Sequence, residues 1–145
     1  MKNNPLIARV LVGGILVYAG FVKAVGPAAE FAAAIAAYKL LPTALVTPWS
    51  IALPYIEMWV GLFVLTGFYT RKAAMAAMVL FSAFFIALAS ALFRGIDLAS
   101  CGCFGADALS PRYTILMDAV LGVLSVVIYR QSLVPPPLSL DKTLP

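Results

Sequence analysis

The sequence predicts an all-α, polytopic membrane protein: a four-transmembrane-helix bundle with a short interfacial helix between the first two spans. Hydrophobic residues make up 63% of the chain and the mean hydropathy is +1.02, which is more apolar surface than a soluble core of this size hides. Four apolar segments also approach the roughly 20 residues that cross a hydrocarbon core. Each must be helical, because backbone amides in lipid need partners within their own segment.

The four predicted spans are residues 5–22, about 45–69, 73–93 and 113–129. We expect the first to be retained as a span, because no convincing small-residue cleavage site follows its apolar core. Small residues in the spans predict close helix contacts rather than a site; they are Gly13, Gly14, Gly20, Gly61, Gly67, Ala73, Ala74, Ala76 and Ala77. The aromatic residues Trp49, Tyr55, Trp59, Phe84 and Phe85 are predicted in the interfacial belt or the core rather than in a cofactor pocket.

The alanine-rich stretch at residues 26–42 opens with Gly-Pro and closes before Pro42. Its helix of about 14 residues is too short to cross a bilayer. We therefore expect an interfacial or re-entrant helix, with Tyr38 and Lys39 near the headgroups. Residues 1–131 are predicted to form one transmembrane domain, and residues 132–145, which contain three consecutive prolines, an irregular tail.

The net charge of +4 contains no basic run, which indicates charge flanking membrane segments and no nucleic-acid partner. With the N-terminus inside, the inner side holds more basic residues than the outer side: Lys2, Arg9, Arg71, Lys72, Arg130 and Lys142 against Lys23, Lys39, Arg94 and Arg112. The adjacent Arg71 and Lys72, expected in a short loop, strengthen this bias. The predicted topology is N-in/C-in in a bacterial inner membrane, with the segment between the last two spans on the periplasmic side.

Cys101 and Cys103 are the only cysteines and are separated by Gly102. A disulfide between them would close a small ring that departs from relaxed geometry, and a strained, exposed disulfide exchanges readily with a partner thiol. We predict a catalytic thiol pair, with Gly102, Phe104 and Gly105 supporting the loop. A structural bridge, inert thiols and a metal shared with a partner are the alternatives. Without histidine, two cysteines do not predict a metal site within the chain.

Glu57 lies well inside the second predicted span. A carboxylate there is costly and usually faces a partner in the bundle interior. The candidate partners are Lys23, Arg9, or a backbone or tyrosine donor such as Tyr18. Glu57 would carry a proton or bind a quinone headgroup, or it would be a structural clasp between helices, which we favour. Asp118 has a similar interpretation, nearer the outer surface.

The chain resembles the DoxX-like group of four-helix membrane proteins at residues 9–23, Phe31, 38–42 and 54–57, with Gly61 and Gly67. The Cys-Gly-Cys-Phe-Gly motif at residues 101–105 resembles the MauE-type branch, known from methylamine utilisation. The resemblance covers about residues 6–130. It implies a membrane partner for a periplasmic thioredoxin-like protein such as MauD. It also implies functional roles for Cys101 and Cys103, and less directly for Glu57 and Lys23.

The predicted function is therefore an integral membrane thiol–disulfide redox protein. It would support disulfide formation or electron transfer to a periplasmic thioredoxin-like partner. One thiol pair on one face cannot pass electrons across a membrane without a second carrier, and a quinone is the economical candidate for that cofactor. The alternative is a non-catalytic accessory subunit or assembly factor of a larger membrane complex. A small-solute transporter is less favoured, because no inverted repeat is evident. The client protein stays open, since related proteins occur outside methylamine operons.

Overall fold

The computed structural model describes residues 5–96 and 110–132, and every regular element in these ranges is an α-helix. The long helices are α1 (Pro5–Val25), α3 (Thr43–Thr66), α4 (Thr70–Phe93) and α5 (Pro111–Gln131), and the short α2 (Ala28–Ala37) follows α1. All four long helices are long and apolar enough to cross a membrane. The prediction of an all-α, multi-pass membrane protein with a short helix between the first two spans is confirmed.

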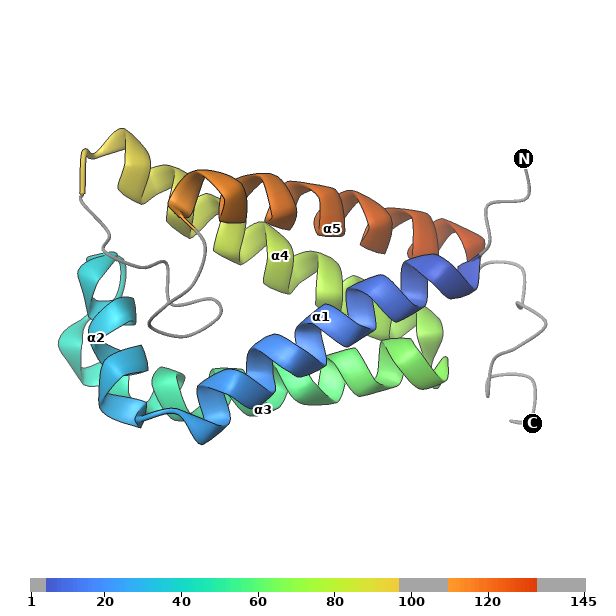
Figure 1. Ribbon diagram of the computed structural model, residues 1–145, viewed down its shortest axis with the longest axis horizontal. Helices are drawn as coiled ribbons and strands as arrows, with labels where there is room; N and C mark the ends of the chain where they lie inside the picture. Colours follow the sequence, from blue (N-terminus) through green and yellow to red (C-terminus); the bar gives the residue numbers. More distant parts are fainter. Residues whose placement is uncertain (1–4, 97–109, 133–145) are drawn as a thin grey trace.

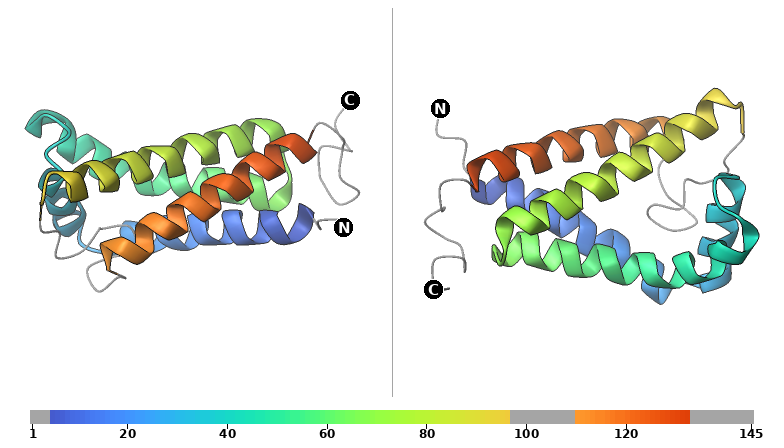
Figure 2. Two further views of the ribbon diagram at one scale, coloured as in Figure 1. Left: turned by 90° about the horizontal axis from the view of Figure 1, so that it is seen from above. Right: turned by 180° about the vertical axis from the view of Figure 1, so that it is seen from behind.

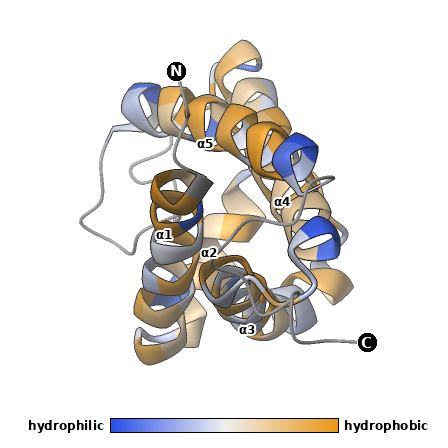
Figure 3. Ribbon diagram, turned by 90° about the vertical axis from the view of Figure 1, so that its right-hand side faces the viewer, coloured by the Kyte–Doolittle hydropathy of each residue, from blue (hydrophilic) through white to orange (hydrophobic). Residues whose placement is uncertain are grey.

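The long helices form two pairs, α1 with α3 and α4 with α5, which also contact each other through α3 with α4 and α1 with α5. Seen end-on, they surround a common axis, and most of their residues are hydrophobic (Figure 3); many large apolar side chains are exposed. The start of α1, the α3–α4 turn and the end of α5 share one end of the bundle, and α2 lies at the other (Figure 1). The two pairs diverge toward α2, as seen in Figure 1 and from behind in the right-hand view of Figure 2.

The turn between α3 and α4 lies earlier in the chain than predicted, at residues 67–69. Gly67, with φ 70°, ends α3, and its N–H donates to Phe63 O at 3.0 Å. A left-handed residue at this position is a common helix stop because it satisfies carbonyls of the last turn. Tyr69 is also left-handed and α4 begins at Thr70. The predicted span end at residue 69 is therefore wrong, and Arg71 and Lys72 lie in the first turn of α4 rather than in a loop.

The ends of the first two helices also differ from the prediction. Helix α1 continues to Val25, past the predicted end at residue 22, because the charge of Lys23 is accommodated inside the bundle. Helix α2 has 10 residues, fewer than the predicted length. It stops before Lys39, whose φ of 51° is incompatible with a continuing right-handed helix.

The hydrophobic core is built mostly from small and branched side chains. Its buried members are Ala8, Val12, Leu16, Val64, Ala73, Ala74, Ala77, Phe81, Leu121 and Ile128. The alanines of α4 let its backbone approach its neighbours, as predicted for that small-residue stripe. Many other large apolar side chains are exposed, for example Phe93 at 93% and Ile86 at 65%. This inside-small, outside-large distribution suits a bundle whose outer surface meets lipid.

Candidate functional site

The predicted catalytic pair Cys101 and Cys103, with Gly102, Phe104 and Gly105, lies outside the described residues. The chain connects this segment to Ile96, just after α4, and to Ser110, just before α5. The end of α4 and the start of α5 both lie in the half of the bundle that holds α2 (Figure 1). Among the described residues, two features are candidates for a functional site: a buried ion pair and an adjoining cleft.

The ion pair joins Lys23, in the last turn of α1, to Glu57, in the middle of α3. Lys23 Nζ donates to Glu57 Oε1 at 2.6 Å and to Oε2 at 2.7 Å. The two side chains are 2% and 0% exposed, respectively. The single ammonium thus satisfies both carboxylate oxygens, which is the geometry that a charge pair in a water-poor interior requires. The predicted placement of Glu57 in the bundle interior with a partner is confirmed.

Glycine positions explain why α1 and α3 come close enough to form the pair. A Cβ on Gly20 would lie 2.5 Å from Pro54 O, and a Cβ on Gly61 would lie 2.8 Å from Gly13 O. Gly20 and Pro54 are one helical turn before Lys23 and Glu57, so the closest backbone approach adjoins the ion pair. The prediction of close contacts is confirmed for these glycines. It is wrong for Gly14, where a Cβ would meet nothing within 4 Å.

The other two candidate partners of Glu57 lie elsewhere. Arg9 is 2% exposed, and it donates from Nε to Val64 O at 3.0 Å and from Nη2 to Leu65 O at 3.1 Å. Its guanidinium fills the space that a Cβ on Gly67 would occupy. Arg9 therefore caps the carbonyl end of α3, where a cation is favourable. Tyr18 is 60% exposed on α1.

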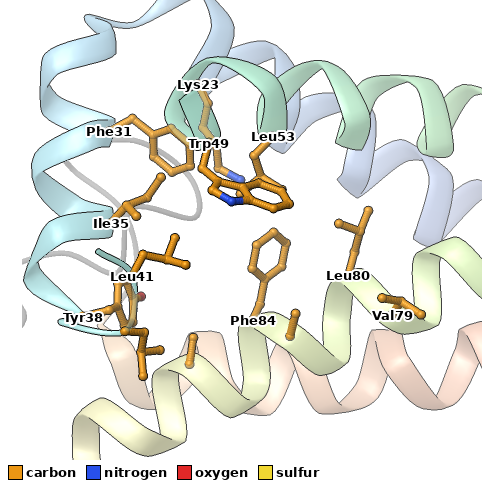
Figure 4. Close-up of a pocket in the computed structure, with 13 residues that line it drawn as sticks. Lys23, Phe31, Ile35, Tyr38, Leu41, Trp49, Leu53, Val79, Leu80 and Phe84 are labelled. Carbon is orange, nitrogen blue, oxygen red and sulfur yellow. The ribbon is translucent and has the colours of Figure 1, made fainter. Parts of the chain in front are cut away.

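A cleft of about 380 Å³ lies between α2, α3 and α4, where the helix pairs diverge. It is lined by Lys23, Phe31, Ile35, Tyr38, Leu40, Leu41, Trp49, Leu53, Val79, Leu80, Ala83, Phe84 and Ala87. Trp49 and Phe84 face each other across it, with Phe31 beside them (Figure 4). Lys23 Nζ lies 5.4 Å from the Phe31 ring centroid and 5.2 Å from that of Phe84.

Some aromatic residues lie in a different environment from the one predicted. The sequence predicts Trp49 and Phe84 in the belt or core, whereas the structure places both on the wall of the cleft. Three consecutive helices build this wall, and no pattern within any one of them indicates how they meet. Trp59, 60% exposed, lies outside the lining. Asp118 is 4% exposed, so it is buried in α5.

A hydrogen bond joins two helices at the end of the bundle near the cleft. Arg94 Nη2 donates to Tyr38 O, which ties the end of α4 to the end of α2.

Within residues 5–96 and 110–132, no three His, Cys, Asp or Glu side chains gather to hold a metal ion.

Comparison with known proteins identifies relatives for most of the chain. A family model described as "Methylamine utilisation protein MauE" matches residues 1–130. A curated protein of Methylophilus methylotrophus, "Methylamine utilization protein MauE", is 32% identical over 105 residues. That alignment covers 71% of this chain and 55% of the relative, so the chain spans about half the length of the curated relative it matches. No solved structure matches the chain.

Proposed function

The chain belongs to the methylamine utilisation protein MauE family, and on that basis we propose that it is a membrane thiol–disulfide exchange protein. Its client is a thioredoxin-like protein outside the cytoplasm, and Cys101 and Cys103 carry the exchange. The observation that carries the proposal is the thiol pair itself: the chain's only cysteines, separated by one glycine, in the segment between two membrane-spanning helices.

In the proposed step, the thiolate of one cysteine attacks a disulfide and forms a mixed disulfide, releasing one thiolate. The second cysteine then attacks the mixed disulfide and releases the other. Run in the opposite direction, a Cys101–Cys103 disulfide oxidises a partner dithiol and becomes a dithiol. Gly102 gives the backbone freedom to close the small ring, and Phe104 and Gly105 support the loop.

The proposed orientation is N-in/C-in in the bacterial inner membrane, which puts the cysteine segment on the periplasmic side. Arg9 and Lys23 are both buried against α3, so neither acts as a loop charge. Removing one from each side leaves the inner excess unchanged: Lys2, Arg71, Lys72, Arg130 and Lys142 against Lys39, Arg94 and Arg112. Basic residues near span ends favour the cytoplasmic side.

Residues 1–131 form the proposed functional domain, with 132–145 as a tail. The names of the family and of the relative refer to methylamine utilisation, and we propose that this chain serves the same kind of system. The wider relationship to DoxX-like proteins is proposed from the sequence resemblance alone.

Trapping experiments test the exchange. In cells, Cys103→Ser or Cys101→Ser should accumulate a mixed disulfide with a partner, seen as a reductant-sensitive shift on a gel. The variant lacking both cysteines is the matched control and should show no shift. A membrane-impermeant maleimide should label the wild type only after mild reduction, and only from outside.

A different result favours the alternative, an accessory subunit or assembly factor. In that case neither single variant traps a partner, and the variant lacking both cysteines supports normal assembly of the client complex. Labelling from the cytoplasmic side alone would contradict the proposed orientation.

A further inference from the structure

We propose that the cleft between α2, α3 and α4 binds a membrane-soluble quinone, with one quinone carbonyl oxygen accepting a hydrogen bond from Lys23 Nζ. The role of this quinone as electron acceptor rests on the function proposed above, whereas its binding does not. The inference is carried by the shape of the cleft, by the one charged group among the described residues that line it, and by its access from lipid.

The shape of the cleft suits a flat ring. Its volume of about 380 Å³ lies in the range of small-molecule sites, which are mostly apolar with a few polar groups. Trp49 from α3 and Phe84 from α4 face each other across it, and Phe31 from α2 lies at the side (Figure 4). Aromatic side chains in such an arrangement favour stacked or edge-on contacts with a further ring.

The polar chemistry of the cleft selects a neutral ligand that accepts a hydrogen bond. Lys23 is the charged residue among the described residues that line it. An ammonium has three N–H donors and no acceptor. Two of the donors can serve the two bonds to Glu57, which leaves one for a ligand. The Glu57 carboxylate offsets the charge of Lys23, so an anionic ligand would gain little electrostatic attraction. A neutral carbonyl oxygen would still accept a hydrogen bond from a charged donor.

The cleft is accessible from the side of the bundle that faces lipid. Val79 and Trp49, which lie on its walls, are 68% and 42% exposed, and both belong to helices that are long and apolar enough to span a membrane. A ligand dissolved in the hydrocarbon therefore enters without crossing a polar surface. A lipid acyl chain would also enter this way, but it would leave the remaining ammonium donor without an acceptor, which is unfavourable in an apolar site.

A quinone here would balance the proposed chemistry. When Cys101 and Cys103 form a disulfide, the two thiols release two electrons and two protons. One quinone takes up both electrons and both protons to become a quinol, and the disulfide is restored for the next client.

Tryptophan fluorescence tests binding directly, because the chain has 2 tryptophans and only Trp49 lines the cleft. The Trp59→Phe variant, purified in lipid nanodiscs, reports on Trp49 alone. Titration with decylubiquinone should quench its fluorescence saturably. The reciprocal Trp49→Phe variant, which reports on Trp59, should show only a linear, non-saturating decrease.

Variants on α4 locate the site without touching the ion pair. In the Trp59→Phe background, Ala83→Phe adds a ring inside the cleft and should weaken decylubiquinone binding by about tenfold or more. The matched control is Ser82→Phe, since Ser82 is the preceding residue, is exposed and does not line the cleft; its binding curve should be unchanged. Circular dichroism confirms that both variants remain helical.

Three results would overturn the inference: linear quenching of Trp49, an unchanged curve for Ala83→Phe, or quenching of Trp49 by brominated acyl chains that decylubiquinone does not relieve. The last would assign the cleft to a lipid chain. Replacing both cysteines by serine should leave binding intact. Saturable binding without mixed-disulfide trapping would therefore refute the thiol function and keep the site, and trapping without binding would do the reverse.

Discussion

The ion pair between Lys23 and Glu57 gives the sharpest energetic prediction. Lys23→Met keeps the length and approximate volume of the side chain while removing its charge, so it leaves Glu57 without its ammonium. Removing one partner of a buried pair costs about 3–5 kcal/mol. The structure supports this full range, because both carboxylate oxygens bind the same Nζ atom and neither side chain is more than 2% exposed. Glu57→Met should cost a similar amount.

The double variant Lys23→Met/Glu57→Met should behave differently. Replacing a buried ion pair by apolar groups of similar volume is often neutral or stabilising, because the attraction within a pair largely offsets its own desolvation. We expect its free energy of unfolding to lie within about 1 kcal/mol of the wild type. The two single changes are therefore far from additive: their separate costs sum to about 6–10 kcal/mol while the double variant costs close to zero, so the coupling energy has a magnitude of about 6–10 kcal/mol.

Reversible unfolding in mixed micelles at increasing SDS, followed by circular dichroism, supplies the four free energies of this cycle. Lys39→Met is the matched control, because Lys39 is exposed beyond the end of α2, and it should leave the unfolding free energy unchanged. Single variants that each cost less than about 1 kcal/mol, the value typical of exposed pairs, would refute the buried geometry. A double variant that costs as much as both singles together would refute the direct contact.

Two further predictions concern the packing of α1 on α3. Gly20→Ala should lower the unfolding free energy by about 1–3 kcal/mol, because its Cβ would lie 2.5 Å from Pro54 O. The control Gly14→Ala, whose Cβ meets nothing within 4 Å, should be neutral or slightly stabilising. Equal thermal stabilities of the two variants in detergent would contradict the close approach of α1 to α3. Arg9→Met should cost about 3 kcal/mol, because two α3 carbonyls lose a charged donor. Arg9→Lys should restore only part of that loss, and full recovery, measured by amide hydrogen exchange in the last turn of α3, would show that the forked contact is unnecessary.

Glu57 shows how much of the candidate site could be predicted from the sequence. A lone carboxylate inside an apolar span signals a buried partner by its cost alone, and the structure confirms that partner's existence. Its identity was open among Lys23, Arg9 and Tyr18. Only the approach of α1 to α3 selects Lys23, because it places Gly20 against Pro54 and brings Lys23 Nζ within hydrogen-bond distance of both Glu57 carboxylate oxygens.

The role of Arg9 also could not be predicted from the sequence. Its position near the start of α1 suggested a flanking charge or a partner for Glu57, whereas it caps the end of α3. The one sequence signal for this role was Gly67, whose left-handed conformation ends α3 and whose missing Cβ admits the guanidinium. That signal has meaning only once the antiparallel pairing of α1 and α3 is known.

The amino-acid order alone determined the helical membrane class, the number of spans, the short helix between the first two and the thiol pair as a functional hypothesis. These follow from hydropathy and from the need of backbone amides for local partners in lipid, both of which act within a single segment. Tertiary structure alone decided that Lys23 neutralises Glu57, that Arg9 caps α3, and that Trp49 and Phe84 form walls of one cleft. Each of these depends on contacts between different helices, which are set by side-chain packing across interfaces that no local period encodes.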